Sequence, residues 1–215
     1  MNILIVDDHP MVANFYQTLL QEAFSEHADL NCHSAFDCEQ AYTELYSLKT
    51  PPTLAIIDYR LPGYEQKQLF NGGDIAKLTR SLFPDCKIFI VTAQTEALII
   101  YDILKKIHPD GLAIKSDIQA DTFIDNVNTV LHGNLYYSAA VKACTQKIWQ
   151  DKNFIDDDNR KIIFFLSKGY KVKDLESVVH LSLSTIQKRI IAMKKAIGIN
   201  ADSSLVAELS LRGFI

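Results

Sequence analysis

Short apolar runs alternate with amphipathic segments along the first 130 residues. The runs at residues 1–6, 53–58, 87–93 and 112–115 are apolar at most positions, and a shorter one lies near Leu30–His33. Runs of this kind predict strands that are buried on both faces, as in a parallel sheet. Between them, apolar residues recur at three- and four-residue spacings, which predicts helices. Strand and helix alternate five times, so we predict an α/β fold, a parallel sheet with helices on both faces.

The pattern changes after residue 132. We interpret residues 1–132 as the first domain, residues 133–153 as a partly helical linker and residues 154–215 as a small all-α domain. Trp149 in the linker is expected to pack against one of the two domains. The helices predicted in the last domain cover about residues 157–166, 172–179, 184–196 and 202–212.

Composition and charge agree with two domains that have different partners. The 215-residue chain is 48% hydrophobic and 22% charged, and no apolar run approaches the length of a membrane span. Its four cysteines are scattered and the N-terminus has no secretory signal, so we expect a cytoplasmic protein with reduced thiols. Residues 1–150 hold 11 basic and 18 acidic residues, whereas residues 151–215 hold 11 and 8. The tail is therefore net basic.

Polar side chains follow the predicted strands where each strand ends: Asp7, Asp8, Asp58, Thr92 and Lys115. Because the carboxyl ends of parallel strands meet at one edge of a sheet, these groups are expected to converge there. Carboxylate oxygens are suitable ligands for Mg²⁺. An isolated Asp8 would equally suit a helix cap, with the first turn following it.

This set suits phosphoryl transfer to a carboxylate. Asp58 would be the nucleophile, and Asp7 and Asp8 would hold Mg²⁺. Lys115 would supply positive charge near the nucleophile, and the Thr92 hydroxyl could hydrogen-bond a phosphoryl oxygen.

The motifs resemble a response-regulator receiver domain of the NarL/FixJ group over residues 1–132. They are DD at 7–8, D at 58 with LP at 61–62, TA at 92–93 and KS at 115–116. The resemblance implies a flavodoxin-like (βα)₅ doubly wound sheet with strand order 2-1-3-4-5, and phosphorylation of Asp58 by a histidine kinase. It also implies that the backbone carbonyl of Arg60 completes the Mg²⁺ site.

Two positions depart from the receiver pattern. Residues 64–71 form an apparent insertion beside the acceptor, either a surface elaboration or a segment that tunes kinase access or phosphoryl lifetime. Leu112 stands where the family usually has an aromatic residue that moves on activation. It would be either an ordinary core leucine or the sign of an altered switch.

The string LSKGYKVKDLESVVHLSLSTIQKRIIAMKKAIGI, residues 166–199, resembles a LuxR-type helix-turn-helix domain. The resemblance implies a homodimer that binds double-stranded DNA. Thr185, Gln187, Lys188 and Arg189 would face DNA, while Lys194 and Lys195 would hold phosphates. Departures from the family pattern are Gln187 in place of Lys, Glu176 in place of a small residue, and three aspartates at 156–158 in place of Leu-Thr-Pro.

We therefore predict a regulator, not an enzyme, in which phosphorylation controls DNA binding. One alternative is a regulator that binds DNA independently of phosphorylation. Another is an aspartyl-phosphate phosphatase of the haloacid dehalogenase family, but that chemistry needs an acid where Arg60 stands. A nucleotide-binding enzyme is disfavoured because no glycine-rich loop follows the first strand.

Overall fold

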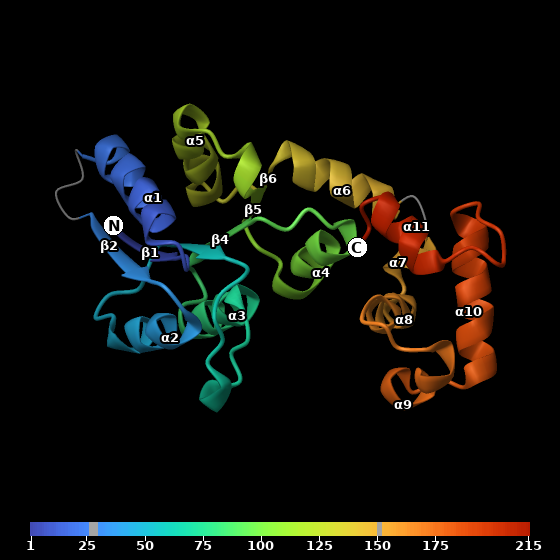
Figure 1. Cartoon of the computed structure of the whole chain (residues 1–215). Coiled ribbons are helices and arrows are strands. Elements are labelled where there is room, and N and C mark those ends of the chain that lie inside the picture. Colours follow the sequence, from blue (N-terminus) through green and yellow to red (C-terminus); the bar gives the residue numbers. More distant parts are fainter. Residues whose placement is uncertain (26–29, 150–151) are drawn as a thin grey trace. The chain divides into compact units, whose positions relative to one another are not determined.

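The computed structural model describes residues 1–25, 30–149 and 152–215, which form two compact units (Figure 1). The first unit comprises residues 1–94 and 103–141, and the second comprises residues 95–102 and 142–215. The side chain of Trp149, for which we predict packing against a domain, lies outside the described residues. No helix in the described ranges is long and apolar enough to cross a membrane.

A six-stranded sheet forms the centre of the first unit. Its strands are β1 (Asn2–Val6), β2 (Asn31–Ala35), β3 (Leu54–Asp58), β4 (Lys87–Thr92), β5 (Gly111–Ile114) and β6 (Tyr136–Tyr137). All neighbours pair in parallel, in the order β2-β1-β3-β4-β5-β6. The first five strands confirm the predicted order. The two-residue β6 is an addition from the segment predicted as a linker.

Helices cover both faces of this sheet, as Figure 1 shows. They are α1 (Pro10–Ala23), α2 (Cys38–Ser47), α3 (Gly72–Leu82) and α5 (Ala120–Leu131). The last turn of α4 (Ala97–Ile107) also belongs to this unit. α1 and α5 pack together over one face, where Tyr16 and Phe123 stack with ring centroids 4.9 Å apart. Alternate apolar side chains of β1, β3 and β4 meet this layer in one buried cluster. The side chains between them are buried on the opposite face, which explains why those strands are apolar throughout.

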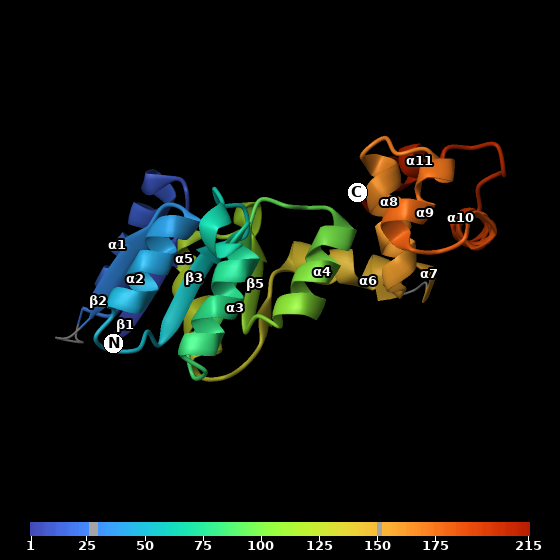
Figure 2. The ribbon, with the colours of Figure 1, turned by 90° about the horizontal axis from the view of Figure 1, so that it is seen from below.

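The second unit is helical. It holds most of α6 (Ala139–Trp149), then α7 (Lys152–Ile155), α8 (Asp157–Ser167), α9 (Glu176–Val179), α10 (Leu183–Ala196) and α11 (Leu205–Leu211) (Figure 2). α10 packs against α7, α8 and α11, and its Ile186 and Met193 are fully buried. The Ser182 side chain accepts a hydrogen bond from the Thr185 N–H and so caps α10. The predicted small helical domain is confirmed.

The first turns of α4 belong to this second unit, although the sequence analysis predicts them as part of the first domain, residues 1–132. The Ala97 and Leu98 N–H groups donate to the carbonyls of Gly213 and Phe214, both at 3.1 Å. The chain end thereby satisfies donors that a helix N-terminus leaves open.

Candidate functional sites

Three carboxylates converge at the carboxyl edge of the sheet. Asp7 and Asp8 follow β1, and Asp58 is the last residue of β3. Ligand atoms of Asp7, Asp8, His9 and Asp58 all lie within 4.8 Å of one another. Asp7 and Asp58 are buried, whereas Asp8 and His9 are exposed, so the cluster opens to solvent on one side.

Lys115 bridges the two buried carboxylates. Its Nζ lies 2.7 Å from Asp58 Oδ2 and 2.8 Å from Asp7 Oδ2. Burial raises the pKa of Asp58, and the hydrogen bond and charge of Lys115 offset only part of that shift. Burial would lower the pKa of Lys115, but its bonds to both carboxylates outweigh burial and raise it. The lysine is therefore held in its charged form beside Asp58 Oδ2.

The other oxygen of Asp58 is held by the backbone. Asp58 Oδ1 accepts a hydrogen bond from the Arg60 N–H at 3.1 Å, and the Arg60 guanidinium donates to Gln94 Oε1 at 2.9 Å. Gln94 is itself buried, and its N–H donates to the buried Thr92 hydroxyl at 3.1 Å. The structure thus adds Gln94, which the motifs gave no reason to single out, to the predicted set.

The donor set fits a divalent cation. Asp7 Oδ2 is buried and, among the described residues, has an ion pair with Lys115 but no hydrogen-bond partner of acceptable geometry. Asp8 does not cap α1, because the cap position is His9 and no side chain of the described residues makes a capping hydrogen bond there. Asp8 Oδ1 instead lies 2.7 Å from His9 Nδ1. Three carboxylates with free lone pairs are suitable oxygen ligands for a hard cation.

The inserted segment folds as a compact turn. Tyr64 and Leu69 form an antiparallel bridge around a single turn of 3₁₀-helix, η1 (Glu65–Lys67). Leu69 is buried, and the Tyr64 ring meets the Tyr42 ring edge-on with centroids 5.8 Å apart. The segment is thus more than polar surface, since it contributes a core side chain.

Leu112 is a core leucine. It lies on β5 between two neighbouring strands, paired with Ile90 of β4 and Tyr137 of β6, and it is fully buried. Of the two alternatives for Leu112, the structure therefore agrees with an ordinary core leucine. The effect of the missing aromatic ring on a switch stays a prediction.

The six residues predicted to contact DNA separate into two groups on α10. Gln187, Lys188 and Lys195 are exposed, which leaves them accessible to a nucleic acid. The other three are engaged within the unit: Thr185 is hydrogen-bonded to Ser182, Lys194 donates to the Ala201 carbonyl, and Arg189 is ion-paired.

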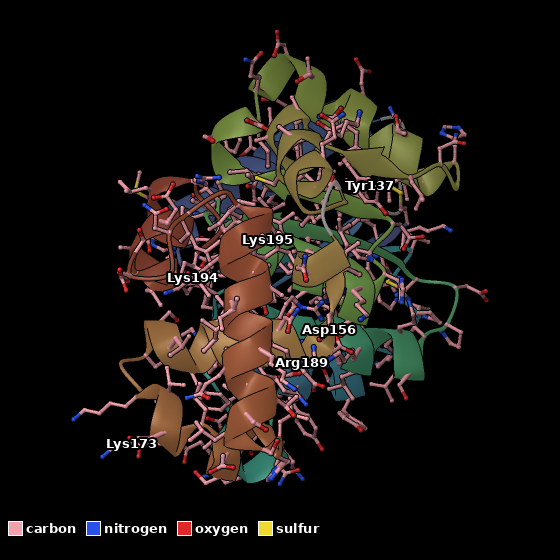
Figure 3. All side chains as sticks on the ribbon, turned by 90° about the vertical axis from the view of Figure 1, so that its right-hand side faces the viewer. Tyr137, Asp156, Lys173, Arg189, Lys194 and Lys195 are labelled. Carbon is pink, nitrogen blue, oxygen red and sulfur yellow. The ribbon has the colours of Figure 1, made fainter. Side chains whose placement is uncertain are left out.

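Arg189 connects α10 to the start of α8, as Figure 3 shows. Its Nη1 donates to Asp156 Oδ1 at 2.8 Å and to Asn159 Oδ1 at 2.9 Å, and Nη2 lies 3.4 Å from Asp158 Oδ2. The aspartates at 156–158 depart from the family pattern, and two of them form the partner surface for this arginine. A base-contacting role for Arg189 would require these bonds to open.

Glu176 also has a structural explanation. Its Oε1 accepts a hydrogen bond from the Leu183 N–H at 2.6 Å. Leu183 is the first residue of α10, so Glu176 fixes the turn between α9 and α10. A small residue at this position could not make that bond.

No family model matches the chain. Among known proteins it is 19% identical, over 210 residues, to a probable transcriptional regulatory protein NarL of Mycobacterium tuberculosis, covering 96% of this chain and 92% of that protein. Its fold matches RcsB from Salmonella enterica serovar Typhimurium bound to promoter DNA with a phosphomimetic, at 20% identity, 98% coverage of each chain and a TM-score of 0.67. A LuxR-family response regulator from Aurantimonas matches 70% of this chain and 98% of that one, with 19% identity and a TM-score of 0.55.

The Mycobacterium protein is a probable transcriptional regulatory protein, and the Aurantimonas protein is a two-component response regulator. The likeness covers both parts of the chain, the parallel α/β unit and the helical unit. The resemblance that the motifs predict is therefore confirmed: over nearly its full length the chain is similar to two-component response regulators of the NarL and RcsB type, and it has their fold of an α/β receiver followed by a helical domain.

Proposed function

We propose that this chain is a phosphorylation-controlled, DNA-binding response regulator. Asp58 receives a phosphoryl group from a histidine kinase, and the modified chain dimerises and binds double-stranded DNA to regulate transcription. The observation that carries the proposal is the convergence of Asp7, Asp8, Asp58 and Lys115 at one sheet edge. A structure of two RcsB dimers bound to two parallel DNAs, which this chain matches at 20% identity with a TM-score of 0.66, supports dimerisation and DNA as the partner.

Each residue has a defined part in the phosphoryl transfer. A carboxylate oxygen of Asp58 forms the new O–P bond while the P–N bond to the kinase histidine breaks and its ring nitrogen keeps the electron pair. Asp7, Asp8, Asp58 and the Arg60 carbonyl would hold Mg²⁺, which neutralises charge on the phosphoryl oxygens when bound. Lys115 pairs with the resulting aspartyl phosphate, and the Thr92 hydroxyl hydrogen-bonds one of its oxygens. A cytoplasmic location is part of the proposal, because it gives access to a histidine kinase and to double-stranded DNA.

Phosphorylation is tested with acetyl phosphate as a small donor. We expect one phosphoryl group per chain by intact-mass spectrometry, in a Mg²⁺-dependent reaction. Asp58→Asn should abolish labelling because the nucleophile is lost, and Asp8→Ala should suppress it because a metal ligand is lost. Equal labelling of the wild type and Asp58→Asn would place the acceptor elsewhere.

DNA binding is tested by titrations at several salt concentrations on selected and scrambled duplexes. Lys195→Ala should weaken binding to both duplexes alike and lower the salt slope by about one, because a phosphate contact is lost. Gln187→Ala should weaken binding only to the selected duplex, by roughly 1–3 kcal/mol, because a base contact is lost. If wild type binds no duplex even after phosphorylation, the DNA-binding assignment fails.

Constitutive DNA binding is the second candidate, and the leucine at position 112 favours it. The same titrations distinguish the two. Under control by phosphorylation, acetyl phosphate tightens binding by the wild type and leaves Asp58→Asn unchanged. Under constitutive binding, both proteins have the same affinity with and without the donor.

A further inference from the structure

The exposed residues of α10 lie in a single row. They are Ser184, Gln187, Lys188, Ile191, Ala192, Lys195 and Ala196, which we call the outer row. Members of the row recur every three or four positions, so they share one side of the helix. Ile191 is the large apolar member of the row, and 61% of its surface is exposed.

Contacts on three sides fix which side of α10 faces outward. Ile186 and Met193 are fully buried against the rest of the unit. Arg189 on one flank is bound to Asp156 and Asn159, and Lys194 on another flank donates to the Ala201 carbonyl. Turning the helix to bury Ile191 would break these bonds and expose Met193. The contacts of α10 with the rest of the unit therefore keep Ile191 exposed.

The charges around Ile191 match one class of partner. Lys188 precedes it by three residues and Lys195 follows it by four, so cations flank it along the row. α10 contains no acidic residue, and its side chains carry a net positive charge. Duplex DNA presents phosphates to the flanking lysines and, in the major groove, the C5-methyl of thymine as an apolar group for a side chain such as Ile191.

From this arrangement we propose that Ile191 is a specificity-determining residue that contacts a thymine methyl group in the major groove. This inference rests on the proposed DNA-binding function and adds the class of base that one position reads. Lys188 and Lys195 supply sequence-independent affinity around it. Arg189 acts as a positioning residue, because its bonds to α8 hold Ile191 outward.

The test removes the methyl group without removing a hydrogen bond. A preferred duplex is selected from random sequences by the phosphorylated full-length protein, and each thymine is then replaced in turn by deoxyuridine. For the wild type, one such replacement should weaken binding about 4-fold, the value expected for about 0.8 kcal/mol per buried carbon. For Ile191→Ala the same replacement should have no effect. Leu211→Ala, which truncates an apolar residue of α11 that is 83% exposed, is the matched control and should behave as wild type.

Three results would overturn the inference. If no deoxyuridine replacement changes the affinity of the wild type, the thymine contact of Ile191 is wrong, while the DNA-binding function still stands. Equal sensitivity in wild type and Ile191→Ala assigns the methyl contact to another residue. Sedimentation showing that Ile191→Ala dissociates a dimer, with uniform weakening on all duplexes, makes Ile191 part of a protein interface instead. Absence of binding to any duplex is a separate outcome, because it overturns the proposed function as well.

Discussion

At the scale of single residues, Gly72 lies directly against the backbone of Asp58. A Cβ at this position would lie 1.8 Å from the Asp58 carbonyl oxygen and 2.9 Å from Ile57 Cγ2. The Gly72 N–H also donates to the Tyr59 carbonyl at 2.9 Å. The start of α3 therefore holds the end of β3 in place, and with it the position of the Asp58 carboxylate.

Gly72→Ala should both destabilise the first unit and impair the acceptor site. The added methyl cannot fit without shifting β3 or α3, and overpacking of this kind costs about 1–3 kcal/mol. Urea unfolding measures the loss, and acetyl phosphate labelling should slow because Asp58 is displaced. Gly133→Ala is the control, since its added methyl meets no atom of the described residues within 4 Å and the cost there comes from a φ of +82°. That control should label at the wild-type rate. A Gly72→Ala protein with unchanged stability and labelling would contradict the argument.

The convergence of the charged residues at the sheet edge could be predicted because each of them stands at the end of an apolar run. Asp7, Asp58 and Lys115 needed only the parallel alternation to be brought together. Gln94 could not be found in this way, because its place beside Arg60 depends on how the loops after β3 and β4 lie against each other. The periodicity of a single strand does not determine its register against the neighbouring strand or the path of the loop that follows it.

At the scale of elements, the positions of the helices in the sequence were predictable. Which side chains of each helix face the rest of the unit was predictable only in part. The limits of α8 and α10 agree with their periodicity, and the buried Ile186 and Met193 follow from core spacing. The engagement of Arg189 did not follow, because its partners lie about 30 residues earlier in the chain. The strand β6 was also missed, since two residues after a glycine turn carry too little pattern to predict a strand.

The inserted turn gives the element-scale prediction. Its exposed tip lies between Tyr64 and Leu69, whose backbones bond to each other at 2.6 and 3.2 Å. Replacing residues 65–68 by Gly-Gly should leave the sheet folded, because Leu69 and the helices around the sheet remain. The loop that carries Arg60 would become more mobile, so we expect hydrolysis of the Asp58 phosphoryl group to be several-fold faster.

The measurement is the decay of phosphorylated protein followed by intact-mass spectrometry. Lys67→Ala is the control within the same turn, because it removes only the contact of this ammonium with the Tyr42 ring, 5.2 Å from its centroid. It should decay at the wild-type rate. An unchanged lifetime in the Gly-Gly variant would make the insertion a bystander, and loss of far-UV helical signal would make it structural.

At the scale of the whole molecule, a division into two units was predictable from the change in pattern and charge near residue 150. The assignment of the first turns of α4 to the second unit was not predictable. Its periodicity is that of an ordinary helix of the α/β alternation, yet residues 95–102 pack with the second unit. The side chain responsible, Arg160, belonged to no motif, and its partner on α4, Asp102, lies 58 positions away in sequence. The domain boundaries at 132 and 154 remain a prediction.

Arg160 is the buried charge on which this arrangement depends. Its Nε donates to Asp102 Oδ1 at 3.0 Å, its guanidinium lies 4.9 Å from the centroid of the Tyr101 ring, and its remaining nitrogens bond to Asp157 and the Ile155 carbonyl. Only 7% of the residue is exposed. Removing one partner of a buried pair costs about 3–5 kcal/mol, and the partial exposure of Asp102 reduces this.

We therefore expect Arg160→Ala to lower the free energy of unfolding of the second unit by about 2–3 kcal/mol. Arg212→Ala is the matched control, because Arg212 is 2.7 Å from Glu208 in an exposed pair and should cost less than about 1 kcal/mol. Denaturant unfolding followed by far-UV circular dichroism gives both values. Hydrogen exchange should in addition show faster exchange at the Ala97 and Leu98 amides in Arg160→Ala only, since the bonds of these amides to Gly213 and Phe214 form in the same packed unit. If the two variants lose equal stability and those amides stay protected, Arg160 does not hold the start of α4 in the helical unit.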